Sequence, residues 1–420
     1  MKINRRSFVK SAILAGFPTI VPASVFGKNA PSNRITLGCI GVGLHGLSCN
    51  LHNFLYLDGA QIVSVCDVYK SRSLRAQRVV NQKYGTQGCR AYQDFREIIA
   101  DKSVDAVVIS TPDHWHVPIS LMALEAGKDV FCEKPTFRIA EGVALVEAVK
   151  KHNAVFQAGI EDRSIIHYHK MVEWVWNGEI GDVERVEVTL PQKGIRPAER
   201  PIPVPKDLNY SMFVGPADFI PYTRNVTDPW HWRMIRNFSG GLIMDWGAHL
   251  VDTAQLAIND GVPVEVKGTG FIPQHAMTTV PIRFNVDYRY AHGAVLNVKS
   301  GGTKVKIYGS KGWVGNDIWR GQLKASDPKI LRKRYAPGTS KLWKIPTTEH
   351  RNFLQCVRDR KPTTYTAETL HKLCTTLHMG LISIYTGSKL RWDDAKCRFI
   401  DNPAANAWVS HKPREDWKKA

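Results

Sequence analysis

The sequence predicts an α/β fold in two parts. A doubly wound parallel sheet comes first, and an α+β domain with a large open, mostly antiparallel sheet follows. Between residues 34 and 151, short apolar runs alternate with helical patterns, which is typical of βαβ units. Beyond residue 264, several short runs alternate polar and apolar residues or are rich in β-branched residues, which favours antiparallel strands. The length of 420 residues suits two domains with extensions.

The boundaries that we predict are a leader over residues 1–30, a first domain over 31–151 and a second domain with C-terminal helices over 152–420. The leader carries Arg5 and Arg6, followed by Ser and Phe and then by a modestly apolar stretch over 11–26. This arrangement resembles a twin-arginine export signal, which predicts a periplasmic protein. A disordered basic tail is the alternative. Cleavage is expected between Ala23 and Ala30.

The composition is that of a soluble globular protein, with 43% hydrophobic and 23% charged residues. No apolar run reaches the roughly 18 residues that would indicate an integral membrane segment. The net charge is +19, but Lys and Arg are spread along the chain, which favours a solvated basic surface over a nucleic-acid partner. The eight cysteines show no metal spacing, and Cys39, Cys66 and Cys132 fall in apolar runs that predict buried thiols.

A glycine motif follows the first apolar run. Residues 35–40 lead directly into Gly41-x-Gly43-x-x-Gly46. Glycines allow a tight turn and let the backbone approach a pyrophosphate, while the following helix presents free N–H groups. The motif alone is weak evidence, but its position between a strand and a helix predicts a dinucleotide site.

An acid in the right place strengthens this prediction. Asp67 closes the second apolar run, about 20 residues on, where such sites place the acceptor for a ribose hydroxyl. Because a carboxylate repels a 2′-phosphate, the expected cofactor is NAD rather than NADP, although Arg72 and Arg75 lie nearby. Within the glycine loop, Leu44 and His45 are also expected to contact the cofactor.

The next two apolar runs end in polar residues. The run over 104–110 leads into Thr-Pro-Asp-His-Trp-His, and the run over 129–132 leads into Glu-Lys-Pro. Ligands bind at the carboxyl ends of parallel strands, so both segments are expected at the cofactor. The cofactor contacts expected here are Thr111, Pro112, His114, His116, Glu133 and Lys134. Trp115 is expected to pack rather than to take part in chemistry.

With the stretch from Gly240 to Asp252, these motifs make the chain resemble the Gfo/Idh/MocA oxidoreductases, which include glucose–fructose oxidoreductase and inositol dehydrogenase. The resemblance covers most of the chain beyond Arg34. It implies an NAD-binding Rossmann domain and an open sheet that often also serves a partner subunit, hence a homo-oligomer, either a dimer or a tetramer. It also implies that Lys134, Asp245 and His249 line the substrate site beside the nicotinamide.

Oxidation of an alcohol by hydride transfer requires a group that accepts the hydroxyl proton. Lys134 is one candidate, with a pKa expected to be lowered by burial, and His249 is the other. Asp245 and His249 are four residues apart and would share one face of a helix. Asp245 would then position the substrate or the imidazole. A zinc site formed by Asp245, His249 and Asp252 is less favoured because no further ligands are evident, so no metal is predicted.

The substrate expected from this pattern is a sugar, polyol or glycoside. Glu161 and Arg163 stand where the family often has Gln and Arg near the sugar. Tyr168, Trp232 and Arg233 complete the expected substrate contacts, and aromatic rings can stack on the C–H face of a pyranose.

The leading interpretation is an NAD(H)-dependent oxidoreductase that acts on a secondary hydroxyl. A redox-neutral glycosidase with tightly bound NAD is the alternative. It would work by transient oxidation at C3 and elimination, with Lys134, His249 or Tyr168 as the base. A non-catalytic sugar- or nucleotide-binding protein is the third reading.

Overall fold

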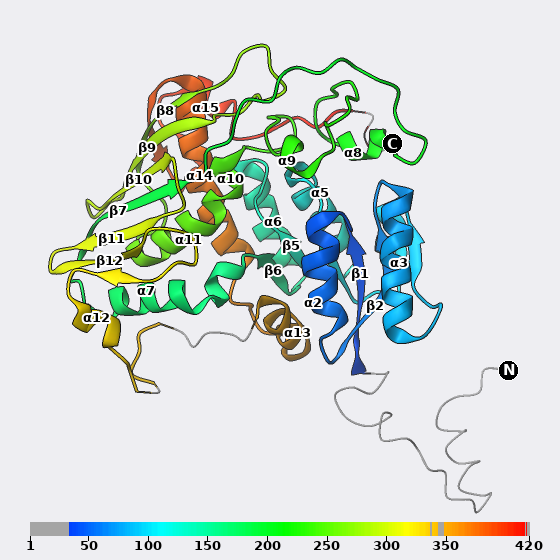
Figure 1. The fold of residues 1–420 in the computed structure, drawn as a ribbon, viewed down its shortest axis with the longest axis horizontal. Coiled ribbons are helices and arrows are strands. Elements are labelled where there is room, and N and C mark those ends of the chain that lie inside the picture. Colours follow the sequence, from blue (N-terminus) through cyan, green and yellow to red (C-terminus); the bar gives the residue numbers. More distant parts are fainter. Residues whose placement is uncertain (1–32, 337, 343–347, 416, 418–420) are drawn as a thin grey trace, which may run out of the picture.

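The computed structural model describes residues 33–336, 338–342, 348–415 and 417, which form two β-sheets with helices packed around them (Figure 1). The predicted export signal lies outside the described residues. Among the described residues, none of the helices combines the length and apolar character needed to span a bilayer.

The first sheet has six strands in the order β3-β2-β1-β4-β5-β6, and all of its neighbouring strands run parallel. The strands are β1 (Ile35–Ile40), β2 (Ala60–Cys66), β3 (Arg90–Tyr92), β4 (Ala106–Ile109), β5 (Asp129–Glu133) and β6 (Phe156–Gly159). The predicted parallel sheet is confirmed. It extends past the boundary predicted at residue 151, because β6 pairs with β5.

The helices of this part follow its strands in alternation. They are η3 (Gly46–Leu51), a π-helical turn that continues into α2 (His52–Leu55), then α3 (Lys70–Tyr84), α4 (Phe95–Ala100), α5 (Asp113–Glu125) and α6 (Ile139–Lys151). Along β4, Ala106 and Val108 join one hydrophobic cluster, whereas Val107 and Ile109 join another. Both faces of the sheet are therefore buried, as a parallel sheet between helices requires.

The second sheet has nine strands in the order β13-β12-β11-β7-β10-β9-β8-β14-β15. They are β7 (Val183–Leu190), β8 (Glu265–Phe271), β9 (Arg283–Arg289), β10 (Val295–Ser300), β11 (Val305–Gly309), β12 (Gly312–Asn316), β13 (Lys324–Ala325), β14 (Lys389–Asp393) and β15 (Arg398–Phe399). The sheet is mostly antiparallel, as predicted, but β7 and β10 run parallel. In β9 every second residue is buried, so one face packs on helices while the other is exposed.

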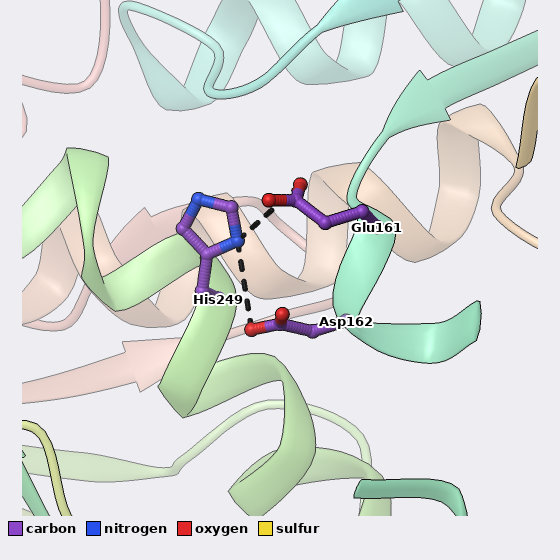
Figure 2. Close-up of side chains that lie close together, drawn as sticks. All are labelled: Glu161, Asp162 and His249. Carbon is purple, nitrogen blue, oxygen red and sulfur yellow. Dashed lines mark ion pairs between the residues drawn. The ribbon is translucent and has the colours of Figure 1, made fainter. Parts of the chain in front are cut away.

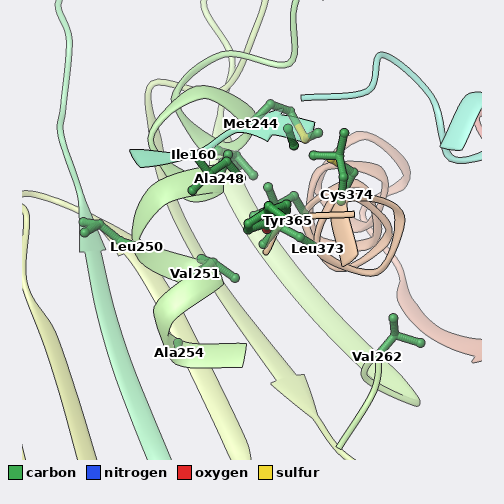
Figure 3. Packing of buried hydrophobic residues seen from close by; sticks show 14 of the residues in the cluster. Ile160, Met244, Ala248, Leu250, Val251, Ala254, Val262, Tyr365, Leu373 and Cys374 are labelled. Carbon is green, nitrogen blue, oxygen red and sulfur yellow. The ribbon is translucent and has the colours of Figure 1, made fainter. Parts of the chain in front are cut away.

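The second part carries η4 (Glu161–Ser164), α7 (Ile166–Trp176), α8 (Tyr210–Val214), α9 (Pro229–Trp232), α10 (Leu242–Asp245), α11 (Gly247–Ile258), α12 (Pro328–Arg332), α13 (Glu349–Asp359), α14 (Ala367–Thr386) and α15 (Pro403–Asn406). Helix α14 packs against α6 of the first part and against α11 and β8 of the second. Figure 3 shows the buried side chains between α11 and α14, among them Ala248, Val251 and Leu373. This packing fixes α10 and α11 relative to the parallel sheet.

A second connection runs from the C-terminal third of the chain back to the first sheet. Phe353 of α13 is fully buried in the same cluster as Leu37 of β1, and its ring meets those of Phe54 and Phe131 edge to face. The Arg358 guanidinium donates to the backbone oxygen of Gly59. Helix α13 thus contributes part of the hydrophobic core that packs on the first sheet.

Candidate active site

A cavity of about 580 Å³ is lined by the turns that follow β1, β2, β4 and β5 and by residues of the second part. This volume is in the range of pockets that hold small molecules and cofactors. The cavity brings together most of the residues that the sequence singles out, although they come from positions between 40 and 319 of the chain.

The glycine loop forms one wall of this cavity. Gly41 has a φ of +82°, and a Cβ at this position would lie 2.7 Å from the backbone of Ser110. A Cβ on Gly46 would lie 1.9 Å from the carbonyl oxygen of Gly41. Gly43, Leu44 and His45 line the cavity as well. The turn is therefore too tight for side chains at its two ends.

Asp67 holds this loop in place. Its carboxylate accepts hydrogen bonds from the backbone N–H of Val42 at 3.0 Å and of Tyr69 at 2.9 Å. Burial raises the pKa of Asp67, while the Arg72 guanidinium opposes this rise. Asp67 and Arg72 both line the cavity. A tight glycine turn beside a buried acid at the end of β2 fits the phosphate and ribose parts of a dinucleotide.

Glu133, at the end of β5, binds the glycine loop through its carboxylate. Its carboxylate lies 2.9 Å from His45 Nε2 and accepts from Asn50 Nδ2 at 2.8 Å. Burial alone would raise the pKa of Glu133, but the charge and hydrogen bond of His45 and the hydrogen bond of Asn50 lower it to about 2. The charge of Glu133 in turn raises the pKa of His45.

Lys134 forms a buried ion pair with Asp245. Its Nζ donates to Asp245 Oδ1 at 2.8 Å and to the Asp245 backbone oxygen at 3.0 Å, and only 8% of the Lys134 side chain is exposed. Arg233 Nε lies 3.5 Å from the other carboxylate oxygen of Asp245.

This pair reverses the pKa expected for the lysine. Burial lowers the pKa of Lys134, but the Asp245 carboxylate outweighs that effect and the pKa is raised overall. The expectation of a lowered pKa is therefore wrong, because it took account of burial without the partner. For Asp245, burial favours the neutral acid, yet Lys134 and Arg233 hold its pKa well below the usual range.

His249 faces two carboxylates from η4 (Figure 2). Its Nδ1 lies 3.6 Å from Asp162 Oδ2 and 3.8 Å from Glu161 Oε2, while the other ring nitrogen points away from both acids. Trp319 Nε1 donates to Asp162 at 3.2 Å. Asp162 is completely buried, and burial raises its pKa to about 6.

The spacing predicted that Asp245 and His249 lie on one continuous helix, but the structure places them on two. Helix α10 ends at Asp245, and α11 begins at Gly247. Both side chains nevertheless line the cavity, because Trp246 keeps helical backbone angles between the two helices.

Arg163 lies outside the cavity. Its Nε and Nη2 donate to the two carboxylate oxygens of Asp252 at 2.9 and 2.8 Å. Its guanidinium lies 4.1 Å from the centroid of the Tyr365 ring. The Tyr365 hydroxyl also donates to Asp252. The expected substrate contact is not supported, because this buried network uses Arg163 to hold η4 against α11. The same network leaves Asp252 unavailable for the zinc site considered from the sequence.

Tyr168 is also placed away from the cavity. It is buried, and its hydroxyl accepts the backbone N–H of Arg320 at 3.0 Å. Burial raises the pKa of Tyr168 to about 12. Neither substrate contact nor the role of a base at neutral pH agrees with this position.

The segment after β4 divides into cavity residues and core residues. Thr111, Pro112 and His116 line the cavity, and the two ring nitrogens of His116 lie 2.9 Å from Thr111 O and 2.8 Å from Pro135 O. His114 does not line it: its Nε2 lies 3.0 Å from the backbone oxygen of Phe213, and its ring is packed among aromatic side chains. The expected cofactor contact of His114 is therefore not supported. Trp115 is buried, in agreement with the expected packing role, and it also borders the cavity.

Aromatic side chains form a further part of the cavity wall. The expected residues Trp232 and Arg233 both line it, and the Arg233 guanidinium lies 4.2 Å from the centroid of the Trp232 ring. Trp246 and Trp319, which the sequence interpretation missed, meet edge to face at 5.2 Å. Trp246 could have been found from its place between the predicted Asp and His, whereas nothing local in the sequence points to Trp319.

Two family models match the chain. The Gfo/Idh/MocA model described as an oxidoreductase family, NAD-binding Rossmann fold, matches residues 35–160. The corresponding model for the C-terminal alpha/beta domain matches residues 170–419. Together they cover both sheets, while Glu161 of η4, which lines the cavity, falls between the two matched ranges.

Curated relatives match over shorter stretches. The chain is 32% identical over 155 residues to an alpha-N-acetylgalactosaminidase of Shewanella oneidensis, which covers 32% of this chain and 34% of that protein. It is 30% identical over 154 residues to a myo-inositol 2-dehydrogenase of Thermotoga maritima, which covers 36% of this chain and 44% of that protein. The chain thus matches less than half the length of these relatives.

Solved structures align with most of this chain. An aldose-aldose oxidoreductase from Caulobacter crescentus aligns with a TM-score of 0.63 at 19% identity, over 86% of this chain and 100% of that chain. Other similar structures were solved with NAD or NADH, including a levoglucosan dehydrogenase with NADH and levoglucosan. At this level of identity the likeness concerns the fold alone.

Proposed function

The chain belongs to the Gfo/Idh/MocA oxidoreductase family, and we propose that it is an NAD(H)-dependent oxidoreductase that acts on a secondary hydroxyl of a sugar, polyol or glycoside. The observation that carries this proposal is the buried Lys134–Asp245 pair. It places an ammonium group in the wall of the same cavity that the glycine loop borders.

The residues that would hold the cofactor come from the first sheet. The loop from Gly41 to Gly46 would approach the pyrophosphate, and Asp67 would receive a ribose hydroxyl. When bound, NAD supplies a two-electron acceptor for hydride transfer. The buried Asp67 carboxylate disfavours a 2′-phosphate, so NAD is the preferred form over NADP.

Lys134 is the group that we assign to proton transfer. With its raised pKa it remains an ammonium at neutral pH and can donate a proton to a carbonyl oxygen in the direction of reduction. In the direction of oxidation it must first lose that proton and then receive the one from the substrate hydroxyl. Asp245 positions Lys134 through two hydrogen bonds, and His249 presents its free ring nitrogen as a contact for a neighbouring hydroxyl.

The cavity wall supports a carbohydrate or polyol as the substrate. Five tryptophans line it: Trp115, Trp230, Trp232, Trp246 and Trp319. Aromatic faces provide apolar surface for sugar C–H groups, while Glu161, Arg233 and His249 supply polar groups in the same cavity. The relative named as a myo-inositol 2-dehydrogenase fits this substrate class.

A second candidate function rests on the relatives named as glycosyl hydrolases of family 109 and as an alpha-N-acetylgalactosaminidase. In this alternative, a glycoside is oxidised at C3, loses its C1 substituent by elimination, takes up water and is reduced again, so no NADH accumulates. Lys134 or His249 would then act as the base. Tyr168 is excluded from that role by its burial and its hydrogen bond.

One experiment separates these functions. The protein is purified without added nucleotide and examined by absorbance and mass spectrometry for bound NAD(H), and it is then incubated with NAD and a panel of polyols and aryl glycosides. Accumulation of NADH with a polyol supports the oxidoreductase, whereas cleavage of an aryl glycoside without net NADH supports the glycosidase. A protein that neither contains nor takes up a pyridine nucleotide would refute both and leave a non-catalytic binding protein.

We also propose that residues 1–30 direct twin-arginine export and that the exposed face of the second sheet joins copies of the chain into a dimer or tetramer. Replacing Arg5 and Arg6 by lysine should retain the protein in the cytoplasm on cell fractionation. Light scattering on the purified protein tests the second proposal, and a monomer at micromolar concentration would contradict it.

A further inference from the structure

Glu161, Asp162 and His249 form a compact cluster at the cavity wall, and the proposed hydride transfer assigns proton transfer to none of them. The imidazole comes from α11 and the two acids come from η4 (Figure 2). His249 Nδ1 is a buried atom without a hydrogen-bond partner, in a side chain that is only 13% exposed. A buried nitrogen that lies within ion-pair distance of two carboxylates but is hydrogen-bonded to neither requires an explanation.

The distances in the cluster suit a shared cation better than direct hydrogen bonds. His249 Nδ1 lies 3.6 Å from Asp162 Oδ2 and 3.8 Å from Glu161 Oε2, which exceeds hydrogen-bond length. Two ligand atoms bound tetrahedrally to one Zn²⁺ stand about 3.4 Å apart, given metal–ligand bonds of about 2.1 Å. The three ligand atoms all lie within 4.8 Å of one another, so small side-chain movements would close the site.

We propose that Glu161, Asp162 and His249 bind a divalent transition-metal cation of the Zn²⁺ type in the wall of the catalytic cavity. One imidazole nitrogen and two carboxylate oxygens form a donor set that Zn²⁺ accepts. Trp319 Nε1 donates to Asp162 at 3.2 Å and so holds that carboxylate in orientation, as groups around metal ligands commonly do.

The electrostatic surroundings favour a cation at this position. Arg320 Nη2 lies 3.2 Å from Glu161 Oε1 and 3.8 Å from Asp162 Oδ1, so one guanidinium faces two carboxylates. The site therefore retains an excess of negative charge that a divalent ion would neutralise.

The metal would give the cavity a second polar anchor. Three protein ligands leave an open coordination position, and Glu161 and His249 both line the cavity, so that position faces the substrate. Ligation through Nδ1 leaves hydrogen on the other ring nitrogen, which then donates, and proton transfer at the carbinol oxygen stays with Lys134. The bound ion would accept oxygens of a vicinal diol, a step that rests on the proposed function.

The test uses the full purified chain after treatment with a chelator. Calorimetric titration with Zn²⁺ should show about one tight site, and Co²⁺ should produce the visible absorption bands of a low-symmetry site. Glu161→Gln and Asp162→Asn should each weaken Zn²⁺ binding by roughly 100-fold, since each removes one of three ligands. Asp260→Asn is the matched control: it alters another His–Asp pair, formed with His292 at the surface, and should leave Zn²⁺ binding unchanged.

Two results would overturn the proposal: no Zn²⁺ or Co²⁺ binding by the wild-type chain, or undiminished binding by both variants. The wild-type titration decides the question even if Asp162→Asn fails to fold. NADH binding, measured on the same samples by fluorescence, keeps the two proposals apart. A chain that binds NADH but no metal refutes only the metal site, and a chain that binds metal but no pyridine nucleotide refutes only the proposed function.

Discussion

Replacement of Lys134 by methionine removes the ammonium group and keeps the apolar stem. Lys134 Nζ lies 2.8 Å from Asp245 Oδ1, and the gross attraction over this distance is about 6 kcal/mol at an effective dielectric constant near 20. Breaking a buried pair typically costs about 3–5 kcal/mol of stability. Arg233 remains 3.5 Å from the Asp245 carboxylate, so we expect a loss near the lower end, about 3 kcal/mol.

The effect on catalysis can be measured separately from the loss of stability. If Lys134 transfers the proton, Lys134→Met should lower kcat/KM by about 10²- to 10⁴-fold while NADH binding changes little. The rate of oxidation by the wild type should increase with pH across the alkaline range. This is because the raised pKa of Lys134 leaves few neutral amines at lower pH. The variant should lose that dependence.

The assay follows steady-state NADH formation between neutral and alkaline pH. Its substrate is any polyol that the wild type oxidises. The matched control is Lys128→Met, which removes another buried ammonium. Lys128 Nζ donates to the backbone oxygens of Asp101 and Val104 and does not line the cavity. This control should lose stability and keep its rate. Wild-type turnover by Lys134→Met, or an equal loss in the control, would refute the assignment.

Three further predictions follow from the geometry. Gly46→Ala places a methyl group 1.9 Å from a backbone oxygen and should abolish NADH binding in a fluorescence titration, whereas Gly88→Ala, with its nearest neighbour at 3.8 Å, should bind normally. His45→Gln should destabilise the fold most between about pH 4.5 and 6.5 in thermal melts. The lowered pKa of Glu133 gives stability that is lost as pH falls from 4.5 towards about 2, and the raised pKa of His45 gives stability that is lost as pH rises above 6.5. Arg163→Leu should cost about 3–5 kcal/mol in urea unfolding because it breaks a buried bidentate pair. The kcat of the folded fraction should not change. A selective loss of kcat would instead indicate that Arg163 contacts the substrate.

The first sheet could be predicted from the sequence because most of its strands are short apolar runs with their own end signals; β3, with the sequence Arg-Ala-Tyr, is the exception. Glycines and acids at those ends also fixed the place of the cavity. Gly41 and Gly46 stand at points where a Cβ would collide with backbone, so their type follows from local geometry. Local signals of this kind are readable without knowledge of the tertiary contacts.

The errors concern side chains whose role depends on a distant partner. Arg163 and Asp252 are 89 residues apart, and Lys134 and Asp245 are 111 residues apart. If burial is considered without Asp245, the pKa of Lys134 is expected to be lowered, whereas in the structure it is raised. The true position of Tyr168 could not be seen from the sequence, because the residue that donates to its hydroxyl, Arg320, is 152 residues away. Such pairings are set by the packing of η4, α10 and α11, which periodicity alone does not specify.

The placement of α13 bears on how this chain can be divided. Phe353 packs against both Phe54 and Phe131, whose rings also meet each other, so a fragment that stops after β6 would expose these apolar side chains on its nucleotide-binding half. We therefore do not expect that half to fold well by itself. A chimera that joins it to an unrelated C-terminal half should aggregate unless α13 is included. During synthesis on the ribosome, the hydrophobic centre of the nucleotide-binding half can be completed only after some 350 residues have emerged, when Phe353 becomes available.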